Sequence, residues 1–312
     1  MSVLAFSRRS MLRAIHMLGA SSVTKWEAGA TVAEEFGGIR MYPSQSIWQD
    51  EPPYTPAREG YIEVDGAKLW YQDGGGTGVP IVLLHASTGS AASWRYQQHR
   101  FATAGYRVIV YSRRGYYRST IENPDVNISG ADDLLALSQA LELPNFHLLG
   151  TAVGGFASVD FALSYPERLR SLVIASSLGG IDEPEFVEVT RRLLTPEVMA
   201  LPSYIKELGP SYRAINPHGT RRWIELEKMA SEGKPALQPK NNRVSWDSLK
   251  RLPPTMFLTG DADLYMPPAL FTLIRPHVPG ARFVVIAEAG HSTSWEQPNA
   301  FNSAVLSFVE QH

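Results

Sequence analysis

The stretch His147–Ser177, HLLGTAVGGFASVDFALSYPERLRSLVIASS, decides how this chain folds. Its apolar start, ending at Gly150, is typical of a strand that is buried on both faces. A sharp turn of small residues follows, then an amphipathic helical stretch, and from Leu169 a second apolar run. The order strand, turn, helix, strand predicts two parallel strands that are joined by a helix.

The same alternation continues on both sides of this stretch. Upstream, YIEVDGAKLWYQDGGG predicts a hairpin that turns at Asp65-Gly66, and VPIVLLHAST predicts another buried strand. Downstream, PTMFLTGDAD and ARFVVIAEAGH predict two strands, and NAFNSAVLSFVEQ predicts a closing helix. The sequence therefore predicts an α/β fold with a mostly parallel, doubly wound sheet and helices on both faces.

Composition excludes several classes of function. The 312 residues are 44% hydrophobic, which is enough to bury a large core. A formal net charge of −2 gives no excess of positive charge with which to bind nucleic acid or an anionic membrane surface. The absence of cysteine excludes disulfides and cysteine catalysis. No apolar run reaches 18 residues, so we expect no membrane span.

The N-terminal part needs separate treatment. Residues 1–57 are punctuated by Pro and Ser and are predicted to form a leader or extension outside the core domain. Ser7-Arg8-Arg9 with Met11-Leu12-Arg13 resembles a twin-arginine export signal, and Ala28-Gly29-Ala30 has the spacing that signal peptidase accepts, which places a signal up to about residue 30. Arg13 and His16 interrupt the apolar region. Two alternatives follow: export to the periplasm or outside the cell, or a basic N-terminal segment on a cytoplasmic protein.

The core domain is predicted over residues 58–312, with one interruption. From about 182 to 246 the pattern is helical, is broken by Pro196, Pro202, Pro210 and Pro217, and contains no strand signal. We interpret it as a helical lid inserted over the carboxyl edge of the sheet. The alternative is a long surface crossover.

The turn in the opening stretch reads Gly150-Thr151-Ala152-Val153-Gly154. A strand-to-helix turn this sharp forces its central residue, Ala152, into a strained backbone conformation and requires small neighbours. The first amides of the following helix, beginning at Val153, point their free N–H groups at the carboxyl edge of the sheet. The turn is therefore suited to stabilise an anion.

Three further segments end at the same edge, where open α/β sheets bind their ligands. LLHASTGSAASW places Ala86 and Ser87 after a strand, and LTGDADLYMPP places Asp261 and Asp263 there. In AEAGHSTSWEQP, His291 follows a strand and a glycine. A carboxylate that orients a histidine makes the histidine a general base.

Together these segments resemble the α/β-hydrolase superfamily, in its lid-bearing esterase, lactonase and C–C-hydrolase-like branch. The resemblance implies the order nucleophile, acid, histidine at Ala152, Asp263 and His291. The spacing to the following proline favours Asp263 over Asp261, which is interpreted as a turn cap. The resemblance also implies oxyanion-hole amides at Ala86, where members usually carry glycine, and at Val153, and it makes Ser87 a candidate contact to substrate.

The chain departs from the family pattern at the nucleophile, because members carry serine where Ala152 stands. Alanine cannot attack a carbonyl carbon. Either Ala152 is a Ser→Ala variant of an esterase or lactonase for a small apolar substrate, or it is native. A native alanine would indicate a lyase, isomerase or hydratase that uses His291 and Asp263 as a general base, or a non-catalytic binder of small molecules.

Aromatic residues near the predicted strand ends and in the lid suggest a small apolar or aromatic ligand. Core packing is the alternative explanation for each of them. No metal-ligand spacing and no dinucleotide fingerprint occur, so we infer neither a metal nor a cofactor. These aromatic residues are Trp94, Tyr116, Tyr117, Trp223, Tyr265 and Trp295, of which Trp94, Trp223 and Tyr265 are the candidate substrate contacts.

Overall fold

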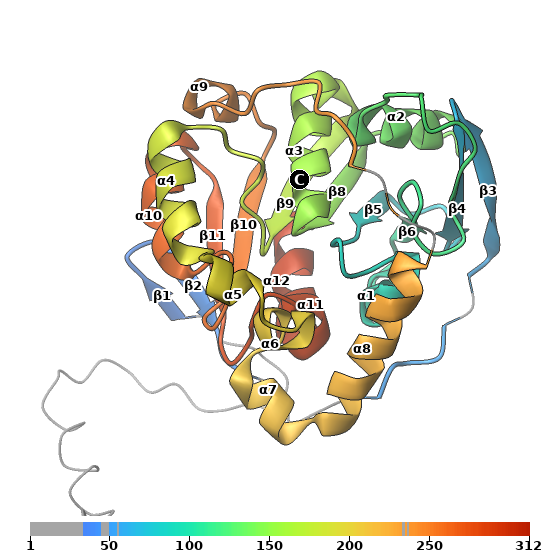
Figure 1. Cartoon of the computed structure of the whole chain (residues 1–312). Coiled ribbons are helices and arrows are strands. Elements are labelled where there is room, and N and C mark those ends of the chain that lie inside the picture. The colour runs from blue at the N-terminus through green and yellow to red at the C-terminus, as the bar shows by residue number, and fades with distance from the viewer. Residues whose placement is uncertain (1–33, 45–49, 55, 233–234, 236) are drawn as a thin grey trace, which may run out of the picture. The chain divides into compact units, whose positions relative to one another are not determined.

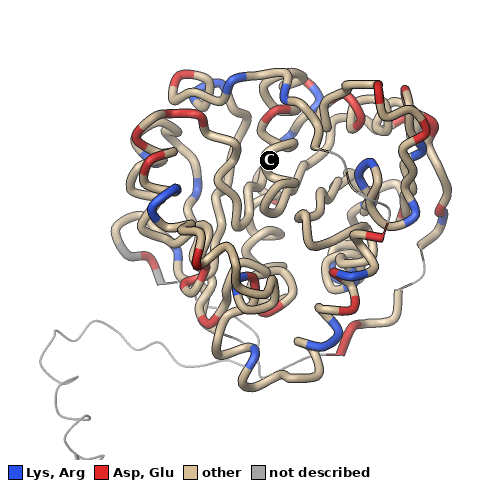
Figure 2. The backbone as a smooth tube through the Cα atoms, viewed as in Figure 1, with Lys and Arg blue, Asp and Glu red and all other residues tan. Residues whose placement is uncertain are grey.

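The computed structural model describes residues 34–44, 50–54, 56–232, 235 and 237–312. The predicted export signal lies outside these residues. Within them, no helix is both long enough and apolar enough to span a membrane. Positively and negatively charged residues are interspersed along the described backbone (Figure 2).

One mixed sheet organises the described part of the chain (Figure 1). Its strand order is β1-β2-β11-β10-β9-β8-β5-β6-β4-β3, with β7 paired to β4. The central strands from β2 to β6 in this order run parallel, whereas β1, β3, β4 and β7 pair antiparallel. The strands are β1 (Glu34–Phe36), β2 (Ile39–Tyr42), β3 (Arg58–Val64), β4 (Ala67–Asp73), β5 (Pro80–Leu84), β6 (Arg107–Tyr111), β7 (Thr120–Ile121), β8 (Phe146–Thr151), β9 (Leu169–Ala175), β10 (Thr255–Gly260) and β11 (Arg282–Ile286).

Helices cover both faces of this sheet, as the sequence pattern predicts. In Figure 1, α3 lies in front of β8 and β9, and α12 lies behind the sheet. The helices are α1 (Arg95–Thr103), α2 (Gly130–Ala140), α3 (Val153–Ser164), α4 (Pro184–Leu193), α5 (Pro196–Met199), α6 (Ser203–Glu207), α7 (Pro210–Ile215), α8 (Pro217–Ser231), α9 (Trp246–Leu249), α10 (Phe271–Ile274), α11 (Thr293–Glu296) and α12 (Pro298–Val309), with 3-10 turns at η1 (Ala91–Trp94), η2 (Pro166–Arg168), η3 (Pro268–Leu270) and η4 (Arg275–His277).

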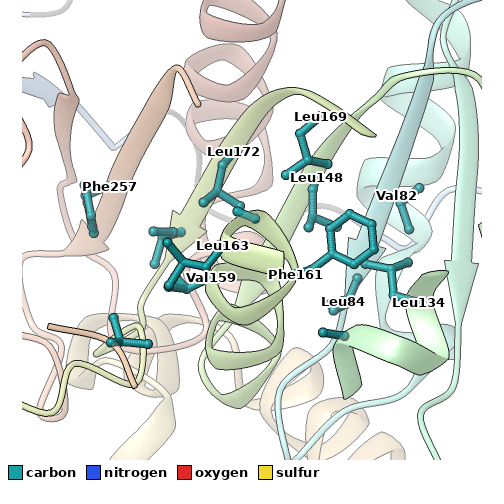
Figure 3. Packing of buried hydrophobic residues seen from close by; sticks show 14 of the residues in the cluster. Val82, Leu84, Leu134, Leu148, Val159, Phe161, Leu163, Leu169, Leu172 and Phe257 are labelled. Carbon is teal, nitrogen blue, oxygen red and sulfur yellow. The ribbon is translucent and has the colours of Figure 1, made fainter. Parts of the chain in front are cut away.

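The continuous apolar strands pack against helices on both sides. In β5, Val82 and Leu84 belong to the cluster that includes α2 and α3, and the alternate residues Ile81 and Leu83 belong to the cluster that includes α1 and α12. Figure 3 shows the first cluster, where Phe161 of α3 packs beside Leu148 and Leu134. Because successive residues of a strand face opposite sides, a strand between two helix layers must be apolar throughout.

The predicted hairpin is confirmed, since β3 and β4 pair antiparallel with Val64 opposite Ala67. Gly66 in its turn has a φ of 72°, which glycine adopts without a Cβ penalty. The prediction that residues 1–57 lie outside the core is wrong for two of its segments. Strand β2 pairs parallel with β11 and buries Tyr42, and β1 pairs with β2. Both strands are short, and most of β2 is only half-buried, so their sequence lacks the apolar run that identifies the central strands.

The segment predicted as a lid is helical in the described residues. Helices α4 to α8 follow one another between β9 and β10, and α6, α7 and α8 lie together at one end of the strands (Figure 1). Four of the five begin with a proline at the first or second helical position, where the missing amide hydrogen is not needed. The prolines that break the sequence pattern therefore mark helix starts.

Candidate active site

Ala152 stands at the turn between β8 and α3. Its φ of 49° and ψ of −118° lie in a region that residues with a Cβ rarely adopt. Three hydrogen bonds hold it there: its N–H donates to the Ala175 carbonyl (3.1 Å), and its carbonyl accepts from the Ser177 hydroxyl (2.5 Å) and the Gly155 N–H (3.0 Å). The strain is therefore imposed by the surrounding structure and does not depend on the side chain at 152.

Glycines allow the close approach of helix and strand around this turn. A Cβ on Gly154 would collide with the carbonyl oxygens of Leu84 and His85 at the end of β5. A Cβ on Gly150 would collide with the Ser158 hydroxyl and the Gly154 carbonyl on α3. Small residues at these two positions thus bring the start of α3 against the carboxyl ends of β5 and β8.

His291 and Asp263 form the predicted hydrogen bond. The His291 Nδ1 atom lies 2.8 Å from Asp263 Oδ1 and 2.9 Å from Oδ2, and the two residues are 7% and 3% exposed. The Asp263 carboxylate also accepts hydrogen bonds from the Tyr265 and Met266 amides and the Thr259 hydroxyl. With Nδ1–H donating to the carboxylate, the Nε2 atom of His291 is the one available to accept a proton.

Two opposing effects set the pKa values of His291 and Asp263. Burial disfavours the charged form of each residue, and the opposite charge of the partner favours it. Burial alone would lower the pKa of His291, but the negative charges of Asp263 and Glu207 outweigh it and raise this pKa to about 9. Burial would raise the pKa of Asp263, but the imidazolium charge and the hydrogen bonds to the carboxylate hold it below its usual value. Asp261, interpreted from sequence as a turn cap, accepts the Ala289 N–H and does not touch His291.

Ala152 and His291 line one cavity of ≈ 50 Å³. Of the other predicted site residues, Ala86, Trp94 and Trp223 line it too. Asp263 lies behind His291 and does not reach the cavity. The full lining is His85, Ala86, Thr88, Gly89, Ser93, Trp94, Thr151, Ala152, Glu207, Trp223, Leu226, His291, Ser292, Ser294 and Trp295.

Three predicted contacts are absent from this lining. Ser87 is exposed, in the turn that the Gly89 N–H closes by donating to the Ala86 carbonyl. Val153 is half-buried as the first residue of α3, where its amide has no intrahelical acceptor. Tyr265 instead places its ring against the imidazole of His291, with 4.4 Å between the ring centroids.

Sequence reasoning missed a carboxylate in the cavity, that of Glu207 at the end of α6. This lid residue is only 5% exposed, and its backbone carbonyl accepts the Ser292 N–H, next to His291 (2.9 Å). Its local sequence, Ile205-Lys206-Glu207-Leu208, places two adjacent charged residues between apolar ones, a pattern that is ordinary for an exposed helix and does not mark Glu207 as buried.

A second buried glutamate joins the lid to the histidine loop. The Glu296 carboxylate accepts the Gly290 N–H (2.9 Å) from the residue before His291 and the Gly209 N–H (2.6 Å) from the lid. Burial raises the pKa of Glu296 to about 8, against the effect of these two donors. Glu296 therefore fixes the position of the lid relative to the loop that carries His291.

Among the described residues, no group of three or more His, Asp or Glu side chains could hold a metal ion. The site combines a buried imidazole–carboxylate pair with a strained turn, and His291 and Ala152 line the same small cavity. Such a pair can accept and return a proton, and the amide of Val153 begins a helix whose positive end is directed at the same place.

Comparison with known proteins places this geometry in a family. The profile of the Alpha/beta hydrolase family matches residues 81–304, which include Ala152, Asp263 and His291. A 2-hydroxy-6-oxononadienedioate/2-hydroxy-6-oxononatrienedioate hydrolase of Burkholderia vietnamiensis is 30% identical to the chain over 292 residues, covering 82% of this chain and 96% of the relative.

Solved structures agree with this assignment. A thermophilic esterase from Thermogutta terrifontis superposes with a TM-score of 0.67 at 27% identity, over 82% of this chain and 99% of the esterase. Est816, described as an N-acyl homoserine lactone degrading enzyme, superposes with a TM-score of 0.64 at 26% identity, over 80% of this chain and 100% of its own.

Proposed function

This chain belongs to the Alpha/beta hydrolase family, and from that membership we propose that its cavity is the substrate site of a small carboxylic ester or lactone hydrolase with alanine at the nucleophile position. One observation carries the proposal: Ala152 keeps a strained turn, with φ of 49° and ψ of −118°, on the cavity that His291 lines. A backbone strained at this point, opposite a buried base, is what a nucleophilic side chain requires.

Each group has a role in this proposal. A serine hydroxyl at position 152 would attack the carbonyl carbon of the substrate, and Nε2 of His291 would take its proton. Asp263 would hold the imidazole in the required tautomer and stabilise the imidazolium. The amides of Val153 and Ala86 would donate to the oxygen on which negative charge develops.

With Ala152 in place, the covalent step is lost and binding remains. Removing a serine nucleophile costs on the order of 10⁶ in kcat when the rest of the machinery is intact. We therefore expect the chain to bind its ester or lactone and to hydrolyse it slowly at best. The relatives named as an esterase and as an N-acyl homoserine lactone degrading enzyme support this choice of substrate class.

The test is the Ala152→Ser variant. We expect it to hydrolyse p-nitrophenyl acetate or a member of a lactone series at least about 10³-fold faster than the unaltered chain. The double variant Ala152→Ser/His291→Ala should lose this gain. A serine variant that folds and shows no gain on any ester or lactone contradicts the proposal.

A second candidate function rests on the His291–Asp263 pair, which is complete although the nucleophile is absent. An imidazole base beside an oxyanion-binding turn could remove a substrate proton or activate water without a covalent intermediate, as in a lyase, isomerase or hydratase. Turnover of a substrate by the unaltered chain that His291→Ala abolishes favours this candidate. Binding without turnover, before and after Ala152→Ser, leaves a binding protein.

A further inference from the structure

Glu207 is a buried carboxyl group that forms no direct ion pair among the described residues. It is 5% exposed, and within the described residues no Lys, Arg or His nitrogen lies within 4.0 Å of its oxygens. In the described part of the chain, its carboxylate accepts one long hydrogen bond, from the Ser292 hydroxyl at 3.5 Å. Ionising a carboxyl group that is removed from water and has no ion-pair partner costs several kcal/mol, so burial favours its neutral form until a positive charge is placed beside it.

The cavity that Glu207 lines has aromatic walls. Trp94, Trp223 and Trp295 line it, and no Lys or Arg does. The Nε1 atom of Trp223 donates to the Ser292 hydroxyl (3.1 Å), and the Nε1 atoms of Trp94 and Trp295 are buried. The three indoles therefore form the aromatic part of the cavity lining, together with the Glu207 carboxyl group.

We propose that Glu207 and these three tryptophans form a subsite for an organic ammonium group, so that the substrate is an ester or lactone that carries a positively charged amine. The substrate class, an ester or lactone, rests on the proposed function. The ammonium subsite does not depend on it. The faces of indole rings attract cations, and an ammonium donates charge-assisted hydrogen bonds to a carboxylate. The two features favour the same ligand charge.

Charged groups of both signs act on Glu207. These groups are His291 and Asp263 in the loops after the strands, Glu227 on α8 and Lys206 on α6. The charge of Glu207 also raises the pKa of the Tyr265 hydroxyl. Burial raises the pKa of Glu207, and His291 partly opposes this rise. An ammonium group bound beside the carboxylate would lower the pKa of Glu207 further and so stabilise its charged form.

Binding of small probes that lack an ester bond to the full unaltered chain tests the subsite directly. Benzylammonium and benzyl alcohol have similar shapes and differ in charge, and calorimetry at about pH 7 compares their affinities. We expect benzylammonium to bind about tenfold more tightly or better, as for a cation held by aromatic rings and a carboxylate away from water. Equal affinity, or tighter binding of the alcohol, overturns the proposal.

Two variants locate the effect. Glu207→Gln should reduce the preference for benzylammonium to about twofold or less, which corresponds to under about 0.5 kcal/mol. Glu227→Gln removes one negative charge from the lid without altering the cavity lining, and it should leave the preference unchanged. A preference that survives Glu207→Gln, or that Glu227→Gln abolishes, overturns the assignment to Glu207. If Glu207→Gln does not fold, Glu207→Asp, which keeps the charge, must keep the preference.

Failure of this inference and failure of the proposed function are distinguishable. Ala152→Ser is assayed on a neutral ester, p-nitrophenyl acetate, which does not use the ammonium subsite. Hydrolysis of that ester without a preference for benzylammonium leaves the hydrolase and removes the subsite. A preference for benzylammonium without hydrolysis leaves the subsite and removes the hydrolase.

Discussion

Ala152 occupies a backbone conformation that alanine avoids in most proteins. Strain of this kind costs of order 1–3 kcal/mol and persists only where the surrounding structure enforces it. Here the enforcing groups are the Ala175 carbonyl, the Ser177 hydroxyl and the Gly155 amide. Because none of these contacts involves the Ala152 methyl group, the turn should tolerate a change of side chain that fits the cavity.

We therefore expect a graded response in stability at this position. Ala152→Gly should raise the free energy of unfolding by up to about 1 kcal/mol, because glycine adopts positive φ without a Cβ penalty. Ala152→Ser should change it by less than about 0.5 kcal/mol, since the added hydroxyl enters the cavity. Urea unfolding of the three chains measures both. A stability of Ala152→Gly below that of the unaltered chain would show that the turn is not strained.

The pKa of His291 predicts how a restored hydrolase depends on pH. A general base acts in its neutral form, and the His291 pKa is raised from 6.5 to about 9 by Asp263 and Glu207. For Ala152→Ser, kcat/KM should therefore rise about tenfold per pH unit through neutrality and level off near pH 9. Adding Glu207→Gln should move this rise in kcat/KM to lower pH, because one of the charges that raise the pKa of His291 is removed. A limb centred at about 6.5 in Ala152→Ser would contradict the raised pKa.

Individual site residues could be predicted from sequence where they directly follow a strand of the parallel sheet. Asp263 and His291 each follow a buried strand, and parallel strands bring their carboxyl ends to one edge, so their contact could be predicted. Glu207 could not be predicted in this way. Its entry into the cavity depends on how the short helix α6 packs, and a single turn of helix carries no periodicity that reveals which side faces inward.

The β8–α3 unit depends on the absence of side chains at its crossing. Gly154→Ala would drive a methyl group into the Leu84 and His85 carbonyl oxygens. We expect it to lower the free energy of unfolding by about 1–3 kcal/mol, the usual cost of an overpacked interior. It should also weaken ligand binding at the cavity, because the turn at Ala152 would move. Chemical denaturation measures the first effect and calorimetry the second.

Gly105 provides a matched control for that substitution. It has a positive φ of 92°, but a Cβ there would meet no atom within 4 Å. Gly105→Ala should therefore cost stability through backbone strain alone and should leave binding at the cavity unchanged. Equal losses of binding in the two variants would show that Gly154 has no special role in placing the turn.

Elements could be predicted from sequence in proportion to their burial. The strands of the central sheet are apolar at nearly every position, and the hairpin at Asp65-Gly66 has a characteristic turn. Strands β1 and β2 were missed because a short edge strand forms by pairing with its neighbour in the sheet and carries no apolar pattern of its own. The helical character of residues 182–246 was evident, but which of its residues face the cavity was not.

The stability of the whole chain should fall as the solution becomes alkaline. His291 has a folded pKa of about 9 against an ordinary 6.5, so its stabilising contribution is complete below pH 6.5 and is lost as the pH rises through 9. Glu296 acts in the same direction between about 4.5 and 8, because its folded pKa is raised as well. Each of these shifts corresponds to roughly 3–5 kcal/mol at most.

Urea unfolding at about pH 6.5 and about pH 9.5 measures this loss. We expect His291→Gln, which cannot titrate, to reduce the difference between the two conditions by an amount on the order of 3 kcal/mol or less. A chain that is more stable at the higher pH would contradict a raised pKa of His291 in the folded state.

Labelling with a fluorophosphonate, a reagent that reacts with activated serine hydroxyls, tests the central claim most directly. The claim is that this molecule retains a complete hydrolase site around a missing nucleophile. We predict stoichiometric labelling at position 152 in Ala152→Ser, no labelling in the unaltered chain, and loss of labelling in Ala152→Ser/His291→Ala. A folded Ala152→Ser chain that remains unlabelled, or that is labelled equally without His291, would contradict the account.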